Sequence, residues 1–342
     1  MKIRSKAPLR LGIAGGGTDV SPYSDEFGGC VLNATINMYA YAFIDDVISN
    51  NEVIFEAKDL GITETISLNE EFDLQGSLLL HRAVYKRIME QYNNGIYIPL
   101  RLTTQSDAPP GSGLGSSSTM VVAMLEGFRQ LLSLPLGEYD IAHLAFEIER
   151  EDCKLSGGKQ DQYAATFGGF NFIEFYENDR VIVNPLRIRR FIVNEFESSL
   201  ILFFTGTSRD SAKIIDDQIK SIKEDDGTKL HAMHAVKESS YKIKELLFKA
   251  DIKSVAKEFA TAWEAKKATS SSITNGLIND IEQDILSAGA LSMKVSGAGG
   301  GGFIMIIVEP EKRLDVLNTL EKYDGRAHKF QFTDEGAYSW TI

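Results

Sequence analysis

The first third of the chain alternates apolar and polar residues over short segments, which is the pattern of half-buried β-strands. The clearest case is Tyr39–Ile48, with the sequence YAYAFIDDVI. The same pattern predicts strands at Ile3–Arg4, Leu9–Ile13, Val53–Ala57, Glu64–Leu68 and Tyr97–Thr103. Pro8 stands between the first two of these. Because proline has no N–H group to give to a strand ladder, we expect it to separate them.

Further along, apolar residues recur every three or four positions, which predicts helices. Leu80, Val84 and Ile88 share one helical face, and serines that suit an N-cap open the following helix. Helices are expected at Leu78–Tyr92, Ser116–Leu132, Gly137–Asp152, Asp210–Lys223, Lys229–Ala250, Ile252–Lys267 and Ile278–Ala288. Further strands are expected at Gly168–Phe175, Arg180–Val183, Leu200–Phe204, Met293–Ser296, Phe303–Glu309, His328–Phe332 and Tyr338–Ile342.

The distribution of these elements suggests two domains. A chain of 342 residues is long enough for two domains of ordinary size. Strands mixed with helices give way to mostly helix near residue 195. We therefore expect an N-terminal domain over 1–195 and a C-terminal domain over 196–342.

The charge of the chain limits its partners. There are 48 Asp and Glu residues against 36 Lys and Arg, and the formal net charge is −12. An acidic surface repels nucleic acid and anionic membranes, so we expect neither as a partner. If the protein binds phosphate groups, it must hold them locally with backbone N–H groups, a few aimed cations and a metal ion.

Two further features point to a cytoplasmic protein. Cys30 and Cys153 are the only cysteines, too few for a disulfide framework or a metal cluster. The N-terminal segment lacks the apolar run of a signal peptide, and no stretch approaches the length needed to cross a bilayer.

The most informative segment is Pro109–Thr119, PPGSGLGSSST, which precedes a strong helix pattern. Its glycines allow positive φ and a close approach to a ligand, and the helix N-terminus favours an anion. It is not a Walker A loop, because no lysine follows the glycines. A flexible loop with an ordinary helix cap is the alternative. If the segment cradles phosphates, the binding residues are Pro110, Gly111, Ser112, Gly113, Leu114, Gly115, Ser116, Ser117 and Ser118.

Two other segments are rich in glycine. Lys294–Phe303, KVSGAGGGGF, formally matches G-x-G-x-x-G, but a strand pattern follows it where a dinucleotide-binding fold needs a helix. A glycine hairpin lining a crevice fits better, and a tight structural turn is the alternative. Pro8–Gly29 carries AGGGTD, which places the Asp19 carboxylate beside a bare backbone that a sugar hydroxyl can approach. In the alternative reading, Asp19 only caps a glycine turn.

Together, in this order and spacing, the three segments resemble the motifs of the GHMP kinases. PPGSGLGSSST is similar to the family's second motif, with Ser118 where alanine is usual. The first motif has Gly16 and Gly17 where galactokinases carry a Glu-His pair, which argues against galactose as the substrate. The resemblance implies an α+β, two-domain fold: an N-terminal domain like domain 2 of ribosomal protein S5 and a ferredoxin-like C-terminal domain.

Within this family, AGGGTD, GGKQDQYAATFGG and FFTGTSRDSAKI are most similar to the branch that acts on D-glycero-D-manno-heptose 7-phosphate. The resemblance implies ATP-dependent phosphorylation of the anomeric hydroxyl of a sugar phosphate. ATP and Mg²⁺ are the implied cofactors, and a homodimer is a candidate assembly. An L-fucokinase-like enzyme, a mevalonate diphosphate decarboxylase and a non-catalytic sugar sensor are the alternatives.

The resemblance also implies roles for individual residues. Asp161 would act as the base that takes the acceptor proton, or would only orient the hydroxyl, and Arg10 would keep Asp161 ionised. Ser117 and Glu149 would bind Mg²⁺, an ion that prefers oxygen ligands. Glu147 and Glu151 lie close enough in sequence to be mistaken for Glu149.

The sugar and its phosphate need further groups. Thr18 and Asp19 are candidates for the sugar hydroxyls, and the third motif contributes Gly297, Ala298 and Gly299. The cations considered for the substrate phosphate are Arg209, Lys159, Lys6 and Arg4.

Overall fold

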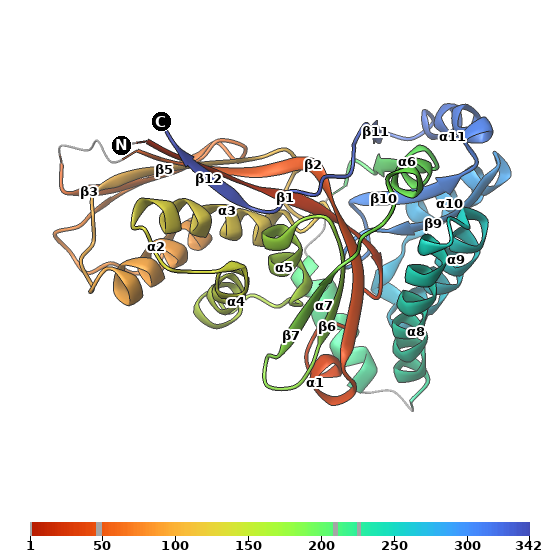
Figure 1. Ribbon diagram of the computed structural model, residues 1–342, viewed down its shortest axis with the longest axis horizontal. Coiled ribbons are helices and arrows are strands. Elements are labelled where there is room, and N and C mark those ends of the chain that lie inside the picture. The colour runs from red at the N-terminus through yellow and green to blue at the C-terminus, as the bar shows by residue number, and fades with distance from the viewer. Residues whose placement is uncertain (1, 46–49, 208–210, 224–226) are drawn as a thin grey trace.

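The computed structural model describes residues 2–45, 50–207, 211–223 and 227–342. Within these ranges the chain forms two β-sheets covered by helices (Figure 1). The first sheet has the strand order β12-β1-β2-β5-β3-β4, with β6 paired to β2 and to β7. Its strands are β1 (Lys2–Ala14), β2 (Gly29–Asp45), β3 (Glu52–Ala57), β4 (Ile62–Ser67), β5 (Leu100–Ser106), β6 (Phe170–Phe175), β7 (Val181–Pro185) and β12 (Tyr338–Thr341).

The second sheet is antiparallel throughout and has the order β11-β8-β10-β9. Its strands are β8 (Leu200–Phe204), β9 (Ala290–Val295), β10 (Phe303–Val308) and β11 (Arg326–His328). The helices are α1 (Tyr23–Phe27), α2 (Leu79–Tyr92), α3 (Ser116–Leu131), α4 (Glu138–Glu147), α5 (Gln160–Phe167), α6 (Arg190–Ser198), α7 (Ser211–Lys223), α8 (Thr228–Phe248), α9 (Ile252–Thr269), α10 (Gly276–Ser287) and α11 (Arg313–Leu320).

Most of the elements expected from periodicity are present, but the prediction for Pro8 was wrong. β1 runs without a break through Pro8, which pairs with Tyr39, and the register shifts before Arg10. β12 pairs with β1 only as far as Lys6, so no second strand needs the missing N–H group at Pro8. A sheet edge or a bulge tolerates proline for this reason.

Other differences concern elements without a clear periodic pattern. β2 begins at Gly29, ten residues before the expected strand, and the end of that expected strand lies outside the described residues. The short helices α1, α5, α6 and α11 were not expected from the pattern. In α5 this has a simple cause, since most of its residues are buried and no polar face alternates with an apolar one.

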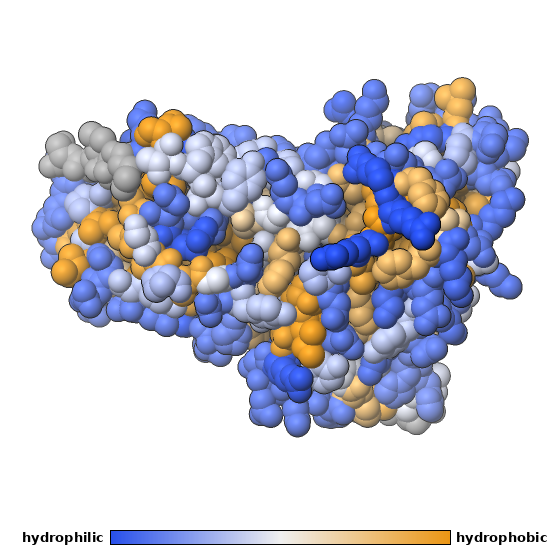
Figure 2. All heavy atoms as spheres, in the orientation of Figure 1, coloured by the Kyte–Doolittle hydropathy of each residue, from blue (hydrophilic) through white to orange (hydrophobic). Residues whose placement is uncertain are grey.

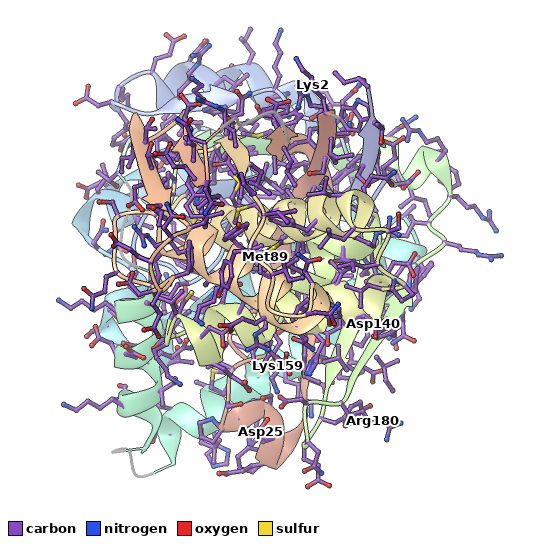
Figure 3. The ribbon with its side chains drawn as sticks, turned by 90° about the vertical axis from the view of Figure 1, so that its left-hand side faces the viewer. Lys2, Asp25, Met89, Asp140, Lys159 and Arg180 are labelled. Carbon is purple, nitrogen blue, oxygen red and sulfur yellow. The ribbon has the colours of Figure 1, made fainter. Side chains whose placement is uncertain are left out.

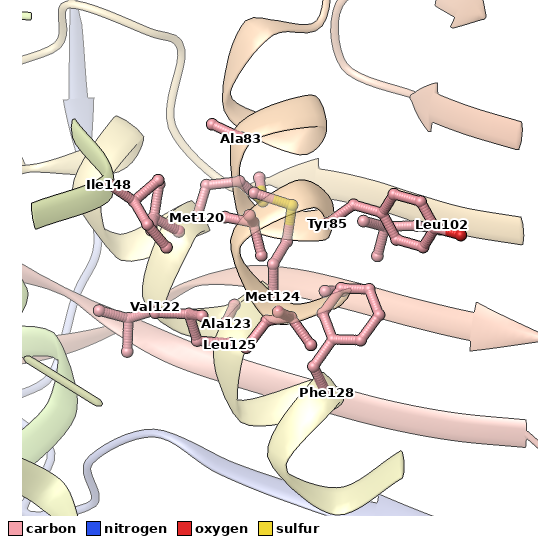
Figure 4. Packing of buried hydrophobic residues seen from close by; sticks show 14 of the residues in the cluster. Ala83, Tyr85, Leu102, Met120, Val122, Ala123, Met124, Leu125, Phe128 and Ile148 are labelled. Atoms are coloured by element: carbon pink, nitrogen blue, oxygen red, sulfur yellow. The ribbon is translucent and has the colours of Figure 1, made fainter. Parts of the chain in front are cut away.

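The helices α2, α3 and α4 cover one face of the first sheet. Their core contains Tyr85, Met124 and Phe128, all with no exposed side-chain surface, packed near Leu102 of β5 (Figure 4). Burying a large apolar side chain contributes roughly 1.5–3 kcal/mol. This packing fixes α3, and the start of α3 therefore has a defined position at the edge of the core.

A second core joins the two sheets. It contains Leu11 of β1 and Leu32 of β2 from the first sheet and Met305 of β10 from the second, together with Phe259 of α9. On the other face of the second sheet, α10 and α11 cover Ile304 and its neighbours. Because one core spans the two halves, the end of β1 is held against the β9–β10 hairpin.

The change of sheet between β7 and β8 falls near the expected domain boundary. The last strand, however, returns to the first sheet: β12 pairs antiparallel with β1, and the two chain ends lie side by side in Figure 1. A simple division at residue 195 therefore assigns Tyr338–Thr341 to a different half from the sheet that contains it. The boundary itself stays a prediction.

Hydrophilic residues cover most of the face shown in Figure 2, with hydrophobic residues gathered in patches between them. Among the described residues, none of the helices combines the length and the apolar character that a membrane span requires.

The strand β12 gives a testable prediction about stability. Ser339 Oγ donates to Glu126 Oε1 at 2.9 Å, which ties β12 to the buried carboxylate of α3. Removal of residues 338–342 should lower the melting temperature by about 5 °C, since each kcal/mol shifts it by roughly 2–4 °C in large domains. Removal of Ile342 alone, which is 68% exposed, is the control and should change little. Equal melting temperatures for both truncations would contradict a stabilising role for β12.

Candidate active site

A cavity of about 490 Å³ lies between the two halves of the molecule. Four segments that are distant in sequence meet around it: the end of β1, the loop before α3, the start of α5 and the β9–β10 hairpin. Helices α7 and α9 close another side with Gln218 and Lys266. All three glycine-rich segments of the sequence therefore line one cavity.

The start of α3 lines the cavity without a side-chain cap. Its N-cap is Gly115, with φ 76°, and no side chain caps the helix. The expectation that a serine caps this helix was wrong, because only glycine adopts this left-handed conformation without strain. The uncapped N–H groups of the first turn and the positive end of the helix dipole are left for a ligand.

The residues predicted to hold phosphate divide into two groups. Ser112 and Leu114 are fully buried and do not line the cavity, which corrects their assignment as ligand contacts. The Ser112 carbonyl instead accepts a hydrogen bond from Phe303 N at 2.8 Å. The residues of the loop that do line the cavity are Pro110, Gly111, Gly113, Gly115, Ser116, Ser117 and Ser118.

Backbone contacts join this loop to the glycine hairpin. A Cβ atom at Gly113 would lie 2.4 Å from the Ser296 carbonyl oxygen, and one at Gly297 would lie 2.8 Å from Gly113 Cα. Ser296 Oγ donates to the Gly113 carbonyl at 2.8 Å. The hairpin leads into β10 and opens no helix, so the G-x-G-x-x-G match does not mark a dinucleotide-binding turn.

Arg10 and Asp161 form an ion pair in the cavity wall. Arg10 Nε and Nη2 lie 2.7 and 2.6 Å from Asp161 Oδ1, and Arg10 Nη1 donates to the Gly113 carbonyl at 2.6 Å. Arg10 is 3% exposed, whereas the Asp161 side chain is 23% exposed. Asp161 Oδ2 lies beside Gly115, and no hydrogen bond recorded among the described residues uses it. This oxygen is available to a hydroxyl group in the cavity.

The first motif contacts the start of α5 through Asp19. The Asp19 carboxylate accepts hydrogen bonds from Gly17 N, Gln160 N and Gln160 Nε2, at 3.0–3.2 Å, and lines the cavity. It thereby holds the first residue of α5, next to Asp161. Thr18 does not line the cavity: its buried hydroxyl lies 2.8 and 2.9 Å from the carbonyl oxygens of Gly15 and Cys30, which share its one proton, and it accepts a hydrogen bond from Cys30 N. Its predicted contact with sugar hydroxyls is corrected on this ground.

Glu149 lies in a π-helical turn (Ile148–Asp152) that follows α4. π-Helical turns of this kind often occur at functional sites. Its carboxylate lines the cavity, accepts a hydrogen bond from Gln162 Nε2 and is 2% exposed. Burial raises the pKa of Glu149, and the charge of Arg150 opposes that rise. Ser117 lines the same cavity, whereas Glu147 and Glu151 do not.

Two of the cations considered for the substrate phosphate do not line the cavity. Lys159 is buried outside the cavity, where its Nζ lies 2.6 Å from Asp179 and 3.6 Å from Asp25 (Figure 3). Lys6 stacks on the rings of Tyr39 and Tyr338 on the first sheet, remote from the cavity. The prediction for Lys159 is therefore corrected, because its charge is already paired.

The remaining candidates have mixed outcomes. Arg4 pairs with Asp45 on the first sheet, and Gly299 packs against Ile273, so neither lines the cavity. Gly297 and Ala298 do line it. Arg209 lies outside the described residues.

Sequence reasoning missed several residues of the cavity wall: Lys266, Arg150, Gln160 and Gln218. Gln160 lies next to Asp161 in the quoted GGKQDQ motif, which was the one available signal. Lys266 is one of two adjacent lysines in a long helix, and nothing in the sequence distinguishes the buried one from its neighbour.

The family models agree with this geometry. The family model described as "GHMP kinases N terminal domain" matches residues 79–169. The model described as "GHMP kinases C terminal" matches residues 243–324. The chain therefore belongs to the GHMP kinases and is an ATP-dependent kinase with their α+β, two-domain fold.

Individual relatives give a more specific comparison than the family models. The D-glycero-alpha-D-manno-heptose 7-phosphate kinase of Campylobacter jejuni is 44% identical over 340 residues, 99% of each chain. A crystal structure described as a D-glycero-D-manno-heptose 1-phosphate kinase from Bacteroides thetaiotaomicron is 44% identical, with a TM-score of 0.85 and 99% coverage of both chains. The bifunctional fucokinase/GDP-fucose pyrophosphorylase of Arabidopsis thaliana is 25% identical and matches 100% of this chain but 32% of its own length.

The contact between Gly113 and the hairpin can be tested by substitution. Gly113→Ala should raise the KM for ATP more than about tenfold, because the added methyl group must push the loop away from Ser296 and misplace its amides. Gly61→Ala is the matched control: Gly61 also has positive φ, but its Cβ would meet nothing within 4 Å. Both variants carry a backbone strain of about 1–2 kcal/mol. Equal ATP KM values would contradict the role of the close contact.

Proposed function

We propose that the protein transfers the γ-phosphoryl group of ATP to the anomeric hydroxyl of D-glycero-D-manno-heptose 7-phosphate, which forms the 1,7-bisphosphate. The observation that carries this proposal is the full-length, 44% identity to a kinase named for that substrate. The cavity supports the proposal because it combines an anion-binding helix start with a carboxylate that is open to an acceptor hydroxyl. We expect this reaction to supply an intermediate of nucleotide-activated heptose synthesis.

The triphosphate of ATP would lie on the loop before α3. The loop's backbone amides and the α3 N-terminus supply fixed positive partial charge without any side-chain cation. This suits a protein of net charge −12, whose surface as a whole would repel the nucleotide. The third motif, at Gly297 and Ala298, would close the cavity over the phosphates and the sugar.

Asp161 would accept a hydrogen bond from the acceptor hydroxyl through Oδ2. In the transfer, a bond forms between the acceptor oxygen and the γ-phosphorus. At the same time the bond between the γ-phosphorus and the oxygen that bridges the β- and γ-phosphates breaks, and ADP leaves. The hydroxyl proton then leaves towards Asp161. Phosphoryl transfer depends mainly on such positioning and on neutralisation of charge. Arg10 would hold the carboxylate in place and balance its charge.

The cavity also has oxygen ligands for Mg²⁺. Ser117 and Glu149 line it together, and the desolvated Glu149 carboxylate would be stabilised in its ionised form by a divalent cation. Among the described residues no three His, Cys, Asp or Glu side chains form a metal cluster. This fits Mg²⁺, which binds through one or two protein ligands with water and phosphate oxygens. When bound, the ion would neutralise the phosphate charge that develops during transfer.

The role of Asp161 gives the next prediction. Asp161→Asn should lower kcat by about 10²- to 10⁴-fold, because the amide cannot take the proton. The KM for ATP should change little, since the loop amides are untouched. Asp45→Asn, which removes a carboxylate that pairs with Arg4 outside the cavity, is the control. An unchanged kcat for Asp161→Asn would contradict the proposed role.

The substrate is tested by measuring ADP release over a panel of sugars and sugar phosphates. The panel contains D-glycero-D-manno-heptose 7-phosphate, the free heptose, L-fucose, galactose and mevalonate diphosphate. The proposal expects the highest kcat/KM for the heptose 7-phosphate and phosphate on its anomeric oxygen in the product.

Other outcomes of this assay would replace the proposal. Preference for L-fucose would favour a fucokinase-like enzyme, and carbon dioxide release from mevalonate diphosphate would favour a decarboxylase. Binding of ATP and sugar by the folded protein without any ADP release would favour a sensor.

A further inference from the structure

An acceptor that already carries a phosphate needs a cation in the cavity to bind it. Three cationic side chains line the cavity within the described part of the chain: Arg10, Arg150 and Lys266. The question is which of them has free hydrogen-bond donors on the acceptor side of the cavity. The answer follows from the contacts that each already makes.

Both arginines bind neighbouring segments of the protein with part of their five N–H donors, and the Arg150 guanidinium lies 3.9 Å from the Glu149 carboxylate, on the side of the proposed metal ligands. Arg10 gives Nε and Nη2 to Asp161 and Nη1 to the Gly113 carbonyl. Arg150 donates from Nη1 to the Leu155 carbonyl at 3.2 Å and from Nη2 to the Gly158 carbonyl at 3.0 Å. Their guanidinium groups therefore hold the segments on either side of Asp161 in place.

Lys266 is different. It is 4% exposed, and the one hydrogen bond recorded for its Nζ is to the Gly297 carbonyl, at 2.5 Å. An ammonium group has three N–H donors, so two remain for a ligand in the cavity. A buried donor without a partner is costly, and an anion would remove that cost.

The position of Lys266 places it on the acceptor side of the cavity. Its Nζ lies 3.7 Å from where a Cβ at Gly16 would stand, and Gln160 Nε2 lies at the same distance from that point. Ser117 and Glu149, the proposed metal ligands, come from α3 and the π-helical turn, whereas Gly16 belongs to the first motif. A ligand group at Lys266 would therefore contact the segment expected to bind sugar.

The charged groups that face Lys266 are Asp19, Arg10 and Lys294. Burial lowers the pKa of Lys266 to about 8, the charge of Asp19 raises it and that of Arg10 lowers it. Lys294, whose Nζ donates to the carbonyls of Gly12 and Ile13, adds a second buried amine whose charge interacts with that of Lys266. The Asp19 carboxylate partly offsets this positive charge while it accepts three hydrogen bonds from Gly17 and Gln160.

From these contacts we infer that Lys266 binds the phosphate group that the acceptor sugar carries before the reaction. This inference rests on the proposed function and names the residue that distinguishes a sugar phosphate from a free sugar. Lys266 replaces Lys159 in this role, since the charge of Lys159 is paired outside the cavity.

The test compares two adjacent lysines. Lys266→Met keeps the length of the side chain and removes its charge. It should raise both KM and Kd for heptose 7-phosphate about 10- to 100-fold, the worth of a hydrogen bond to a charged group. The loss in kcat/KM should be at least about tenfold larger with heptose 7-phosphate than with free heptose, and it should lie in the KM for the sugar phosphate. Lys267→Met is the matched control, because Lys267 pairs with Glu264 and Glu282 away from the cavity.

A pH profile of the wild-type protein supplies a second measurement that needs no variant. The second pKa of a sugar phosphate is near 6, so the ligand stays dianionic above about pH 7.5. The ammonium of Lys266 loses its proton as the pH rises through its pKa. The kcat/KM for heptose 7-phosphate should therefore fall above about pH 8, and this decline should be absent in Lys266→Met.

The outcomes separate the two proposals. Equal losses on phosphorylated and free heptose, or an unchanged pH decline in Lys266→Met, would overturn the assignment of Lys266 and leave the kinase reaction standing. Failure of the folded wild-type protein to bind heptose 7-phosphate by calorimetry or to phosphorylate it would overturn the proposed function, and the assignment of Lys266 with it.

Discussion

The site depends on the contacts of one buried guanidinium group. Arg10 binds Asp161 through two nitrogens and the loop before α3 through the Gly113 carbonyl, all at 2.6–2.7 Å. Arg10 belongs to β1, Gly113 to the loop that precedes α3, and Asp161 to α5. A buried charge pair contributes little net stability, but the loss of one partner is strongly destabilising. Arg10 therefore fixes the position of the Asp161 carboxylate relative to the loop before α3, the two groups proposed to bind the acceptor and the nucleotide.

This geometry requires main-chain segments to approach more closely than side chains would allow. The loop and the β9–β10 hairpin touch at Gly113 and Gly297, where any Cβ atom would collide with backbone. The shared core of the two sheets presses these segments together. The packing of distant apolar residues thus holds polar backbone groups around the cavity. An acidic protein needs such local backbone groups to bind anions, because its overall charge repels them.

The cavity also separates charges by role. Arg10 and Arg150 hold the segments around Asp161, while Lys266 keeps donors available towards the acceptor side. Asp19, expected to bind sugar, accepts its hydrogen bonds from Gly17 and Gln160 and caps the start of α5. Asp19 therefore helps to position Asp161, because it binds the neighbouring residue Gln160.

The sequence by itself determined the family, most strands and helices, and the segments that form the cavity. Periodicity and glycine motifs depend on neighbours within a few residues, and those are visible in a linear chain. Only the tertiary structure decided which side chains face the cavity. Thr18 and Lys159 turned out to be paired inside the protein, Ser112 is buried away from the cavity, and Lys266 keeps N–H donors towards the cavity. The partners of a side chain come from other segments of the fold, as Asp25 and Asp179 do for Lys159, so its residue type alone does not reveal whether it is paired.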